Sequence, residues 1–229
     1  MKKIVLASTL LAVSSFGHAE TSPLSGFYAG GNVSRVQAAM TIEDSDCWYN
    51  CSAYTQEANG ANFGIQGGYN WVQDNLLMGA SLEYLAGGVD ETYDYSGYGS
   101  EPQMHAISEL KSLISLRFRA GLTLGKTALV ISTGPAQGDF ESQFLDADYT
   151  NTNTRYAAKQ SGSVSGWVNG ISIEHAFSGS IVGGVGFSDY VFDDQISEFK
   201  DLSDGSGQDY KVKFINNVSS TGIFVNYQF

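Results

Sequence analysis

Apolar and polar side chains alternate with a period of two along most of this chain, and this pattern limits the possible folds more than any other feature. In residues 61–71 the apolar side chains fall on one face, and Asn, Gln and Gly fall mainly on the other. The last eight residues, 222–229, alternate in the same way and end on Phe229. Successive side chains of a β-strand point to opposite faces, so the pattern predicts a protein built of strands. We expect eight, beginning near residues 27, 62, 75, 110, 127, 163, 180 and 215.

Short and long connections alternate between the predicted strands. The short ones are tight turns at 73–75, 124–126 and 178–180, and the long ones are loops at 37–60, 86–109, 138–160 and 189–212. This asymmetry is typical of antiparallel barrels of bacterial outer membranes, which have short periplasmic turns and long extracellular loops. We therefore expect an all-β, eight-stranded antiparallel transmembrane β-barrel whose two termini are periplasmic and whose last strand pairs with its first.

A soluble barrel such as a lipocalin has the same period-two pattern, so the polar face decides between the two classes. A soluble barrel would expose a charged face to water, whereas the polar faces here consist mainly of Gly, Ser, Asn and Gln. Small and polar residues suit the lumen of an eight-stranded barrel, which is only wide enough to be filled by side chains. Aromatic residues gather near the predicted strand ends, as in the girdles of membrane barrels. These observations favour a membrane barrel with a small, polar interior.

Residues 1–19 have the features of a secretory signal peptide. Lys2 and Lys3 precede an apolar stretch, and Gly17-His18-Ala19 provides a small-x-small cleavage site. The apolar stretch is shorter than the ~20 residues that a spanning helix needs. We therefore expect residues 20–229 to form one barrel domain in the outer membrane of a Gram-negative bacterium.

Cys47 and Cys51, within CWYNC, are the two cysteines of the chain. An exported chain passes through an oxidising periplasm, so we expect them to form a disulfide in the first long loop. The alternatives are two free thiols or half of a metal site, but no other cysteine and no nearby histidine is available to complete such a site.

Four charged residues fall on the small, polar faces of the predicted strands: Glu83, Arg117, Arg119 and Glu174. Unpaired buried charge is very costly, and the planar guanidinium of arginine suits pairing with a carboxylate. We therefore expect these residues to pair inside the barrel and to plug it. The alternative is a continuous water-filled channel. Lys111 and Arg35 are further candidate partners nearer the loops.

The long loops are acidic and rich in tyrosine, with 20 of the 24 acidic and nine of the 13 tyrosine residues in or beside them. A solvated face above negatively charged lipid explains such a surface, and so does a binding role for basic or calcium-bridged partners. We expect outer-membrane lipid and lipopolysaccharide as neighbours and an extracellular protein or host surface as a further partner. The formal net charge of −12 excludes nucleic acid as a natural partner.

Several strand sequences together resemble the small OmpA-like and opacity-type outer-membrane β-barrel family. They are SGFYAGGNVS (25–34), GIQGGYNW (64–71), LRFRAGLTLG (116–125), GWVNGISIEHAF (166–177) and the terminal NYQF. Asn169 and His175 depart from the family pattern, which prefers an apolar residue and an aromatic residue there. The resemblance implies that Tyr227 and Phe229 present a signal to the outer-membrane assembly machinery, and no peptidoglycan-binding domain is expected after Phe229. Members include structural proteins, adhesins and poor pores.

Catalytic residues are hard to find. His105 lies near Glu101 and Glu109 in the second long loop, but no Ser/His/Asp set, metal-ligand spacing or phosphate-binding glycine loop accompanies it. We therefore expect no enzyme and no cofactor. A structural barrel with surface-recognition loops for interaction or adhesion is favoured over a narrow porin-like channel and over an outer-membrane enzyme.

Overall fold

The computed structural model describes residues 22–44, 53–96, 102–148, 151–201 and 210–229. The predicted signal peptide and the predicted Cys47–Cys51 disulfide lie outside these residues. The described part contains nine strands: β1 Gly26–Asp44, β2 Ala53–Gln73, β3 Leu76–Ser96, β4 Pro102–Leu124, β5 Thr127–Asp148, β6 Asn151–Ala176, β7 Ile181–Phe192, β8 Gln195–Asp201 and β9 Tyr210–Gln228. No helix in the described ranges is long and apolar enough to cross a membrane.

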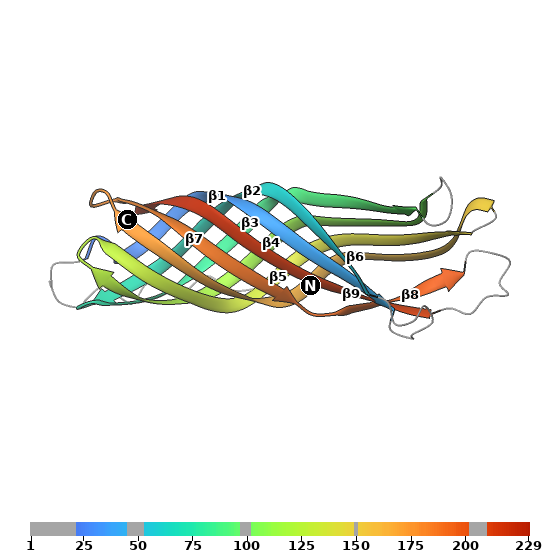
Figure 1. The fold of residues 1–229 in the computed structure, drawn as a ribbon. Helices are drawn as coiled ribbons and strands as arrows, with labels where there is room; N and C mark the ends of the chain where they lie inside the picture. Colours follow the sequence, from blue (N-terminus) through green and yellow to red (C-terminus); the bar gives the residue numbers. More distant parts are fainter. Residues whose placement is uncertain (1–21, 45–52, 97–101, 149–150, 202–209) are drawn as a thin grey trace, which may run out of the picture.

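The strands close into an eight-stranded antiparallel barrel (Figure 1). Each strand from β1 to β7 pairs with the next, β7 pairs with β9, and β9 pairs with β1 from Tyr28↔Gln228 to Asp44↔Val212. The short β8 pairs with β9 and β6, as β7 does, and only Asp193 and Asp194 separate it from β7. β7 and β8 therefore share one place in the wall, and the predicted all-β barrel of eight strands is confirmed.

The turn ends of the strands lie where the sequence predicts them, but the strands continue much further toward the opposite end. β2 begins at Ala53 instead of near 62, and β6 begins at Asn151 instead of near 163. Much of each predicted long loop is therefore β-strand. In β5 the alternation continues beyond Pro135, with Phe140 buried between the partly exposed Asp139 and Glu141. These polar outward faces look like loop sequence although they follow the period of a strand.

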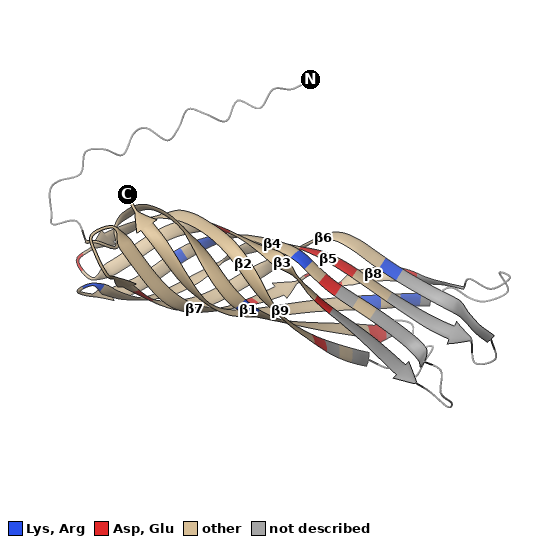
Figure 2. Ribbon diagram, turned by 90° about the horizontal axis from the view of Figure 1, so that it is seen from above, with Lys and Arg blue, Asp and Glu red and all other residues tan. Residues whose placement is uncertain are grey.

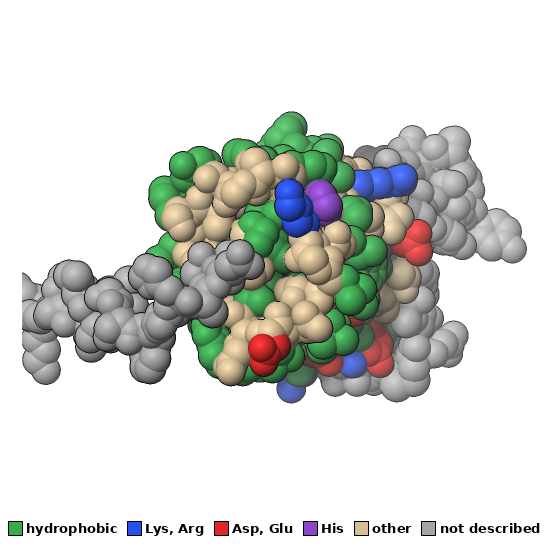
Figure 3. All heavy atoms as spheres, turned by 90° about the vertical axis from the view of Figure 1, so that its left-hand side faces the viewer, with side chains coloured by type: hydrophobic (Ala, Val, Ile, Leu, Met, Phe, Trp, Pro, Cys, Tyr) green, Lys and Arg blue, Asp and Glu red, His purple; other side chains and the backbone are tan. Residues whose placement is uncertain are grey.

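The outer face of the turn-side half of the barrel is an apolar band. Phe63 and Ile223 each expose 65% of their surface, and every strand of the closed barrel contributes large exposed hydrophobic side chains. Figure 3 looks onto the turn end and shows hydrophobic side chains around its circumference with few charged ones. In water such a band would be costly, whereas in lipid it is the expected outer surface of a barrel.

The interior has apolar clusters on either side of a polar middle, which differs from the mainly small and polar lumen that the sequence predicts. Near the turns, a cluster is formed by Leu24, Leu77, Ala128, Val130, Ala176 and Val182. On the loop side, a larger cluster includes Val36, Leu85, Leu113, Phe140, Val168, Tyr190 and Phe192. Where strands stand in water beyond the band, their apolar face must turn inward. This requirement explains the second cluster.

Candidate functional site

The polar middle of the barrel is built around Arg117 and Arg119, which point inward from β4. They are two residues apart, so the alternation of the strand places both on the same face. Arg117 forms an ion pair with Glu83 of β3, and Arg119 forms one with Glu174 of β6. The structure thus brings the four charged residues of the predicted interior cluster together as two pairs.

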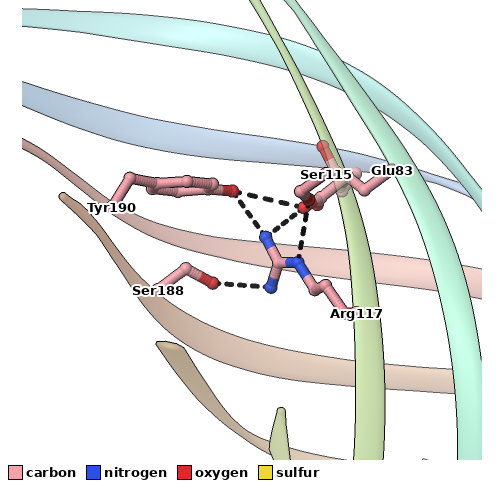
Figure 4. A network of polar contacts seen from close by, with 6 residues as sticks. Glu83, Ser115, Arg117, Ser188 and Tyr190 are labelled. Atoms are coloured by element: carbon pink, nitrogen blue, oxygen red, sulfur yellow. Dashed lines mark hydrogen bonds and ion pairs between the residues drawn. The ribbon is translucent and has the colours of Figure 1, made fainter. Parts of the chain in front are cut away.

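Arg117 is held from several strands at once (Figure 4). Its Nη1 donates to Ser188 Oγ at 2.8 Å, its Nε donates to Ser115 Oγ at 3.1 Å, and its Nη2 donates to the hydroxyl of Tyr190. The guanidinium carbon also lies 5.5 Å from the centre of the Tyr190 ring, within the range of a cation–π contact. The guanidinium is therefore fixed in position as well as neutralised.

Glu83 has partners besides Arg117. Its Oε1 accepts a hydrogen bond from Asn32 Nδ2 at 2.7 Å, and its Oε2 accepts one from the Tyr190 hydroxyl at 3.3 Å. Side-chain exposures of 12% for Arg117 and 11% for Glu83 place the pair out of bulk water. Buried ion pairs persist when further hydrogen bonds satisfy the charged groups, and this pair meets that condition.

The second pair is similarly arranged and more deeply buried. Arg119 donates to the hydroxyl of Tyr28 as well as to Glu174, and its guanidinium carbon lies 5.3 Å from the Tyr28 ring centre. Ser172 Oγ donates to Glu174 Oε1 at 2.9 Å. The side chains of Arg119 and Glu174 expose only 8% and 3% of their surface. Two acids and two arginines leave this layer with no net charge.

A cavity of about 70 Å³ lies beside the ion pairs and is lined by both arginines and both acids. Asn32 Oδ1 and Ser34 Oγ, which also belong to lining residues, are buried and have no hydrogen-bond partner within the described part of the chain. Polar cavities of this kind hold ordered water. The apolar clusters lie toward either end of the barrel from this layer, and the small volume suits a few water molecules better than a ligand.

Lys111 and Arg35, the other candidate partners, both lie outside the lumen. A register shift between Leu110 and Ser112 in the β4–β5 ladder turns Leu110 inward and Lys111 outward. Lys111 then pairs with Glu141 of β5, whose other oxygen lies 2.8 Å from Lys159 Nζ. Arg35 is on the outward face of β1. The structure therefore corrects their proposed role in the lumen, because a β-bulge reverses the alternation at Lys111 and Arg35 follows Val33 on the exposed face.

Hydrogen bonds from Lys111 and Lys159 lower the pKa of Glu141 from 4.5 to about 2. Because the folded-state pKa is depressed, the stabilisation from this group is present above pH 4.5 and is lost as the pH falls through about 2. We expect an NMR titration of the Glu141 carboxyl to give a midpoint near 2, and Lys111→Met with Lys159→Met to raise it toward 4.5. Asp139→Asn, which keeps both lysines, serves as the control. A wild-type midpoint near 4.5 would contradict the ion-paired arrangement.

The predicted assembly signal lies at the closing seam. The Phe229 amide donates to Phe27 O at 2.9 Å, and Tyr227 is paired with Ala29 on one side and Ile181 on the other. Phe229 exposes 77% of its surface. The last strand is thus paired almost to its end with aromatic side chains facing outward, and a role in assembly stays a prediction.

Asn169 and His175, which depart from the family pattern, both lie on the outward face of β6. Asn169 Oδ1 accepts a hydrogen bond from Thr133 Oγ1 at 2.8 Å, and the indole N–H of Trp167 donates to the same hydroxyl at 2.8 Å. A ring nitrogen of His175 lies 2.8 Å from Thr127 Oγ1. Polar atoms facing lipid need such partners.

In the described ranges no group of three or more His, Cys, Asp and Glu residues is placed to hold a metal ion.

Comparison with known proteins places this fold among outer-membrane proteins. No family model matches the sequence. The 31 kDa outer-membrane immunogenic proteins of Brucella melitensis biotype 1 and Brucella suis biovar 1 are each 27% identical to it over 153 residues, which is 66% of this chain and 61% of the relative. The chain thus matches about three fifths of the length of these curated relatives.

Solved structures of other outer-membrane proteins share the fold. Outer membrane protein OprG from Pseudomonas aeruginosa aligns with a TM-score of 0.55 and 10% identity, covering 90% of this chain and 97% of its own. Outer membrane protease OmpT from Escherichia coli aligns with a TM-score of 0.51 and 8% identity, covering 93% and 99%. At these identities the likeness concerns the fold alone. Fold and sequence relatives together make this chain an outer-membrane β-barrel protein. Its resemblance to opacity-type proteins in particular stays a prediction.

Proposed function

We propose that this protein is a non-conducting outer-membrane scaffold that presents an acidic, tyrosine-rich surface to an extracellular partner. The observation that carries the proposal is the filling of the barrel, in which a polar layer with two ion pairs lies between two apolar clusters. A barrel filled in this way has little room for transport. Its distinguishing chemistry is therefore on the outside.

The charged surface lies on the strand extensions beyond the apolar band, and Figure 2 shows charged residues gathered in that half of the molecule. We call the acidic residues there the acidic crown. Its described members, all at least partly exposed, are Glu43, Glu57, Asp90, Glu109, Asp139, Glu141, Asp189, Asp193, Asp194 and Glu198. A surface of this composition favours a basic protein or a calcium-bridged partner. The proposal includes an extracellular crown and periplasmic turns, as in other outer-membrane barrels.

A narrow channel is the second candidate function and is less well supported, because the cavity beside the ion pairs has a volume of only about 70 Å³ and apolar clusters lie toward either end of the barrel. We propose no catalytic role. The protease activity named for OmpT belongs to that protein, and 8% identity carries no activity across.

The crown is expected to bind basic proteins through its charge. Protein in nanodiscs of zwitterionic lipid should bind cytochrome c, a basic probe, several-fold more tightly at low salt than serum albumin, an acidic probe. Neutralising Asp90, Asp139, Asp193 and Glu198 together to Asn or Gln should remove most of that preference. Asp74→Asn removes one charge at the opposite end and should not change it.

Two outcomes would contradict the proposal. One is equal binding of cytochrome c by wild type and by the neutralised variant. The other is protease treatment of intact cells that spares the crown, since an extracellular crown should be cut while the turns are protected.

A further inference from the structure

On one side of the barrel, polar outward residues begin directly beyond the apolar band. On β7, β9 and β1, the first polar outward residues follow directly after Phe187, Ile223 and Val33. Val33 is paired with Ile223 of β9 on one side and with Phe63 of β2 on the other, so the band ends at the same register position on these three strands. Polar side chains on the β7–β9–β1 side therefore reach down to the edge of the lipid-facing surface.

A hollow lies in the outer wall at this place. It has a volume of about 270 Å³ and crosses four adjacent strands, β2, β1, β9 and β7. Its polar lining residues are Gln37, Glu57, Asn59, Asp189, Asn217 and Ser219. We call these six residues together with Arg35 the polar notch. Four of them form one continuous row across the wall, because Asp189 is paired with Ser219, Ser219 with Gln37, and Gln37 with Asn59. Small residues such as Ala39 in this lining leave room for a bound group.

Among the residues that the structure describes, the charges of the notch have no partners. Arg35, Glu57 and Asp189 are exposed, and in the described part of the chain none of them forms a hydrogen bond or ion pair. Two lysines beyond the band do form ion pairs, Lys111 with Glu141 and Lys213 with Glu43. An arginine at the edge of a lipid-facing surface is best accommodated when its guanidinium reaches water or an anionic headgroup.

We propose that the polar notch binds the phosphorylated amino-sugar headgroup of lipopolysaccharide. Arg35 lies one outward position beyond Val33, where its planar guanidinium can bind a phosphate with two parallel hydrogen bonds. The amides of Gln37, Asn59 and Asn217 and the two carboxylates provide donors and acceptors for the hydroxyl and amide groups of the sugars.

The surroundings of the notch favour a glycolipid over a phospholipid. The acyl chains of a bound lipid would lie against Val33, Ile223 and Phe187 on the adjoining band. A phospholipid headgroup would leave most of the amides unused and would bring its phosphate near two carboxylates without sugar groups between them. The inference rests on the proposed function in one respect, because only an extracellular crown places the notch in the outer leaflet.

Purified protein in phospholipid nanodiscs, titrated with lipopolysaccharide, tests the site. Arg35→Gln is expected to weaken binding roughly tenfold or more, as for the loss of charge-assisted hydrogen bonds. Ala39→Trp, which fills the hollow, should also weaken binding. The matched control is Lys126→Gln, which removes one exposed positive charge at the turn end and should bind as wild type. Dephosphorylated lipopolysaccharide should bind wild type and Arg35→Gln equally. Heat-modifiability on a gel identifies the variants that are folded.

Three results would overturn the inference. The first is wild-type affinity in both folded notch variants, and the second is equal competition by a phospholipid such as phosphatidylglycerol. The third is the formation of lipid-free dimers that Arg35→Gln abolishes, because the notch would then be an interface between copies of the chain. Binding is measured on purified protein, so it does not depend on orientation in cells. Protease treatment of intact cells tests that orientation separately, so a failure of the proposed function and a failure of the notch are distinguishable.

Discussion

Glu83→Ala is expected to lower the free energy of unfolding by about 3–5 kcal/mol, which is the usual cost of leaving one partner of a buried ion pair alone. Arg117 would keep its charge at a position where its side chain exposes only 12% of its surface. Tyr190, Ser115 and Ser188 would still hold the guanidinium, but their hydroxyls do not neutralise it. Urea unfolding in detergent micelles measures the change.

Replacing both members of the pair separates the cost of unpaired charge from the loss of packing. Glu83→Met with Arg117→Met should cost much less than Glu83→Ala, because apolar residues of similar size often substitute for a buried pair with little loss. The exposed ion pair that Glu141 forms offers the matched control, because Glu141→Ala should change the free energy of unfolding little. Additive effects of the two single replacements, in a double-mutant cycle, would show that Glu83 and Arg117 are not coupled.

The same variants report on conduction. Wild-type protein in planar bilayers is expected to show no large, stable openings, because the polar layer with its two ion pairs lies between apolar clusters. Glu83→Ala should increase the frequency of brief openings by loosening the central layer. Large and stable wild-type openings would reject the filled barrel and favour the channel.

The sequence predicts the inward charges because alternation is a local property. Glu83, Arg117, Arg119 and Glu174 fall on the same face as Gly and Ser whatever the barrel's final shape. The sequence does not predict that Tyr190 and Tyr28 complete the two ion-paired sites. Those contacts join residues far apart along the chain, and they depend on the tilt and stagger of strands across the lumen. A tyrosine on the inward face of a strand is the one signal that could have suggested them.

Strand ends at the turns are also predictable, whereas the opposite ends are not. Asp74 and Gly125 both adopt positive φ in their turns, and residues that tolerate that conformation mark turns in the sequence. Beyond the apolar band, outward residues face water and become polar, so the contrast that defines a membrane strand disappears. The reversal at Lys111 results from a bulge, which no period-two count reveals.

Gly30→Ala is expected to impair closure of the barrel, and Gly31→Ala is expected to be tolerated. Gly30 faces inward on β1 and is paired with Asn226 of β9. A Cβ added there would lie 2.1 Å from the backbone oxygen of Val225 and 2.3 Å from Asn226 Oδ1. Real Cβ atoms do not approach this closely, so the backbone at the seam would have to move. Gly31 faces outward, and the nearest atom to its added Cβ is Gly64 O at 3.5 Å.

The seam has little freedom to yield. Val225 is paired with Gly31 on one side and with Gly183 of β7 on the other, so a shift of β9 away from β1 compresses the next ladder. Asn226 Oδ1 also accepts a hydrogen bond from Gln66 Nε2 at 2.8 Å, which the new methyl group would displace. Overpacking of this kind typically costs about 1–3 kcal/mol.

Closure gives the substitution a larger effect on assembly than on an already closed barrel. If β1 and β9 do not pair, both strands present unpaired backbone groups to lipid, where each group costs several kcal/mol. We therefore expect the heat-modifiable, folded fraction to fall strongly for Gly30→Ala, to fall further for Gly30→Leu, and to stay at the wild-type value for Gly31→Ala. Equal folded fractions for Gly30→Leu and Gly31→Ala would mean that the β1–β9 seam accommodates larger side chains. The close approach of Val225 to Gly30 would then not explain why glycine is present at this position.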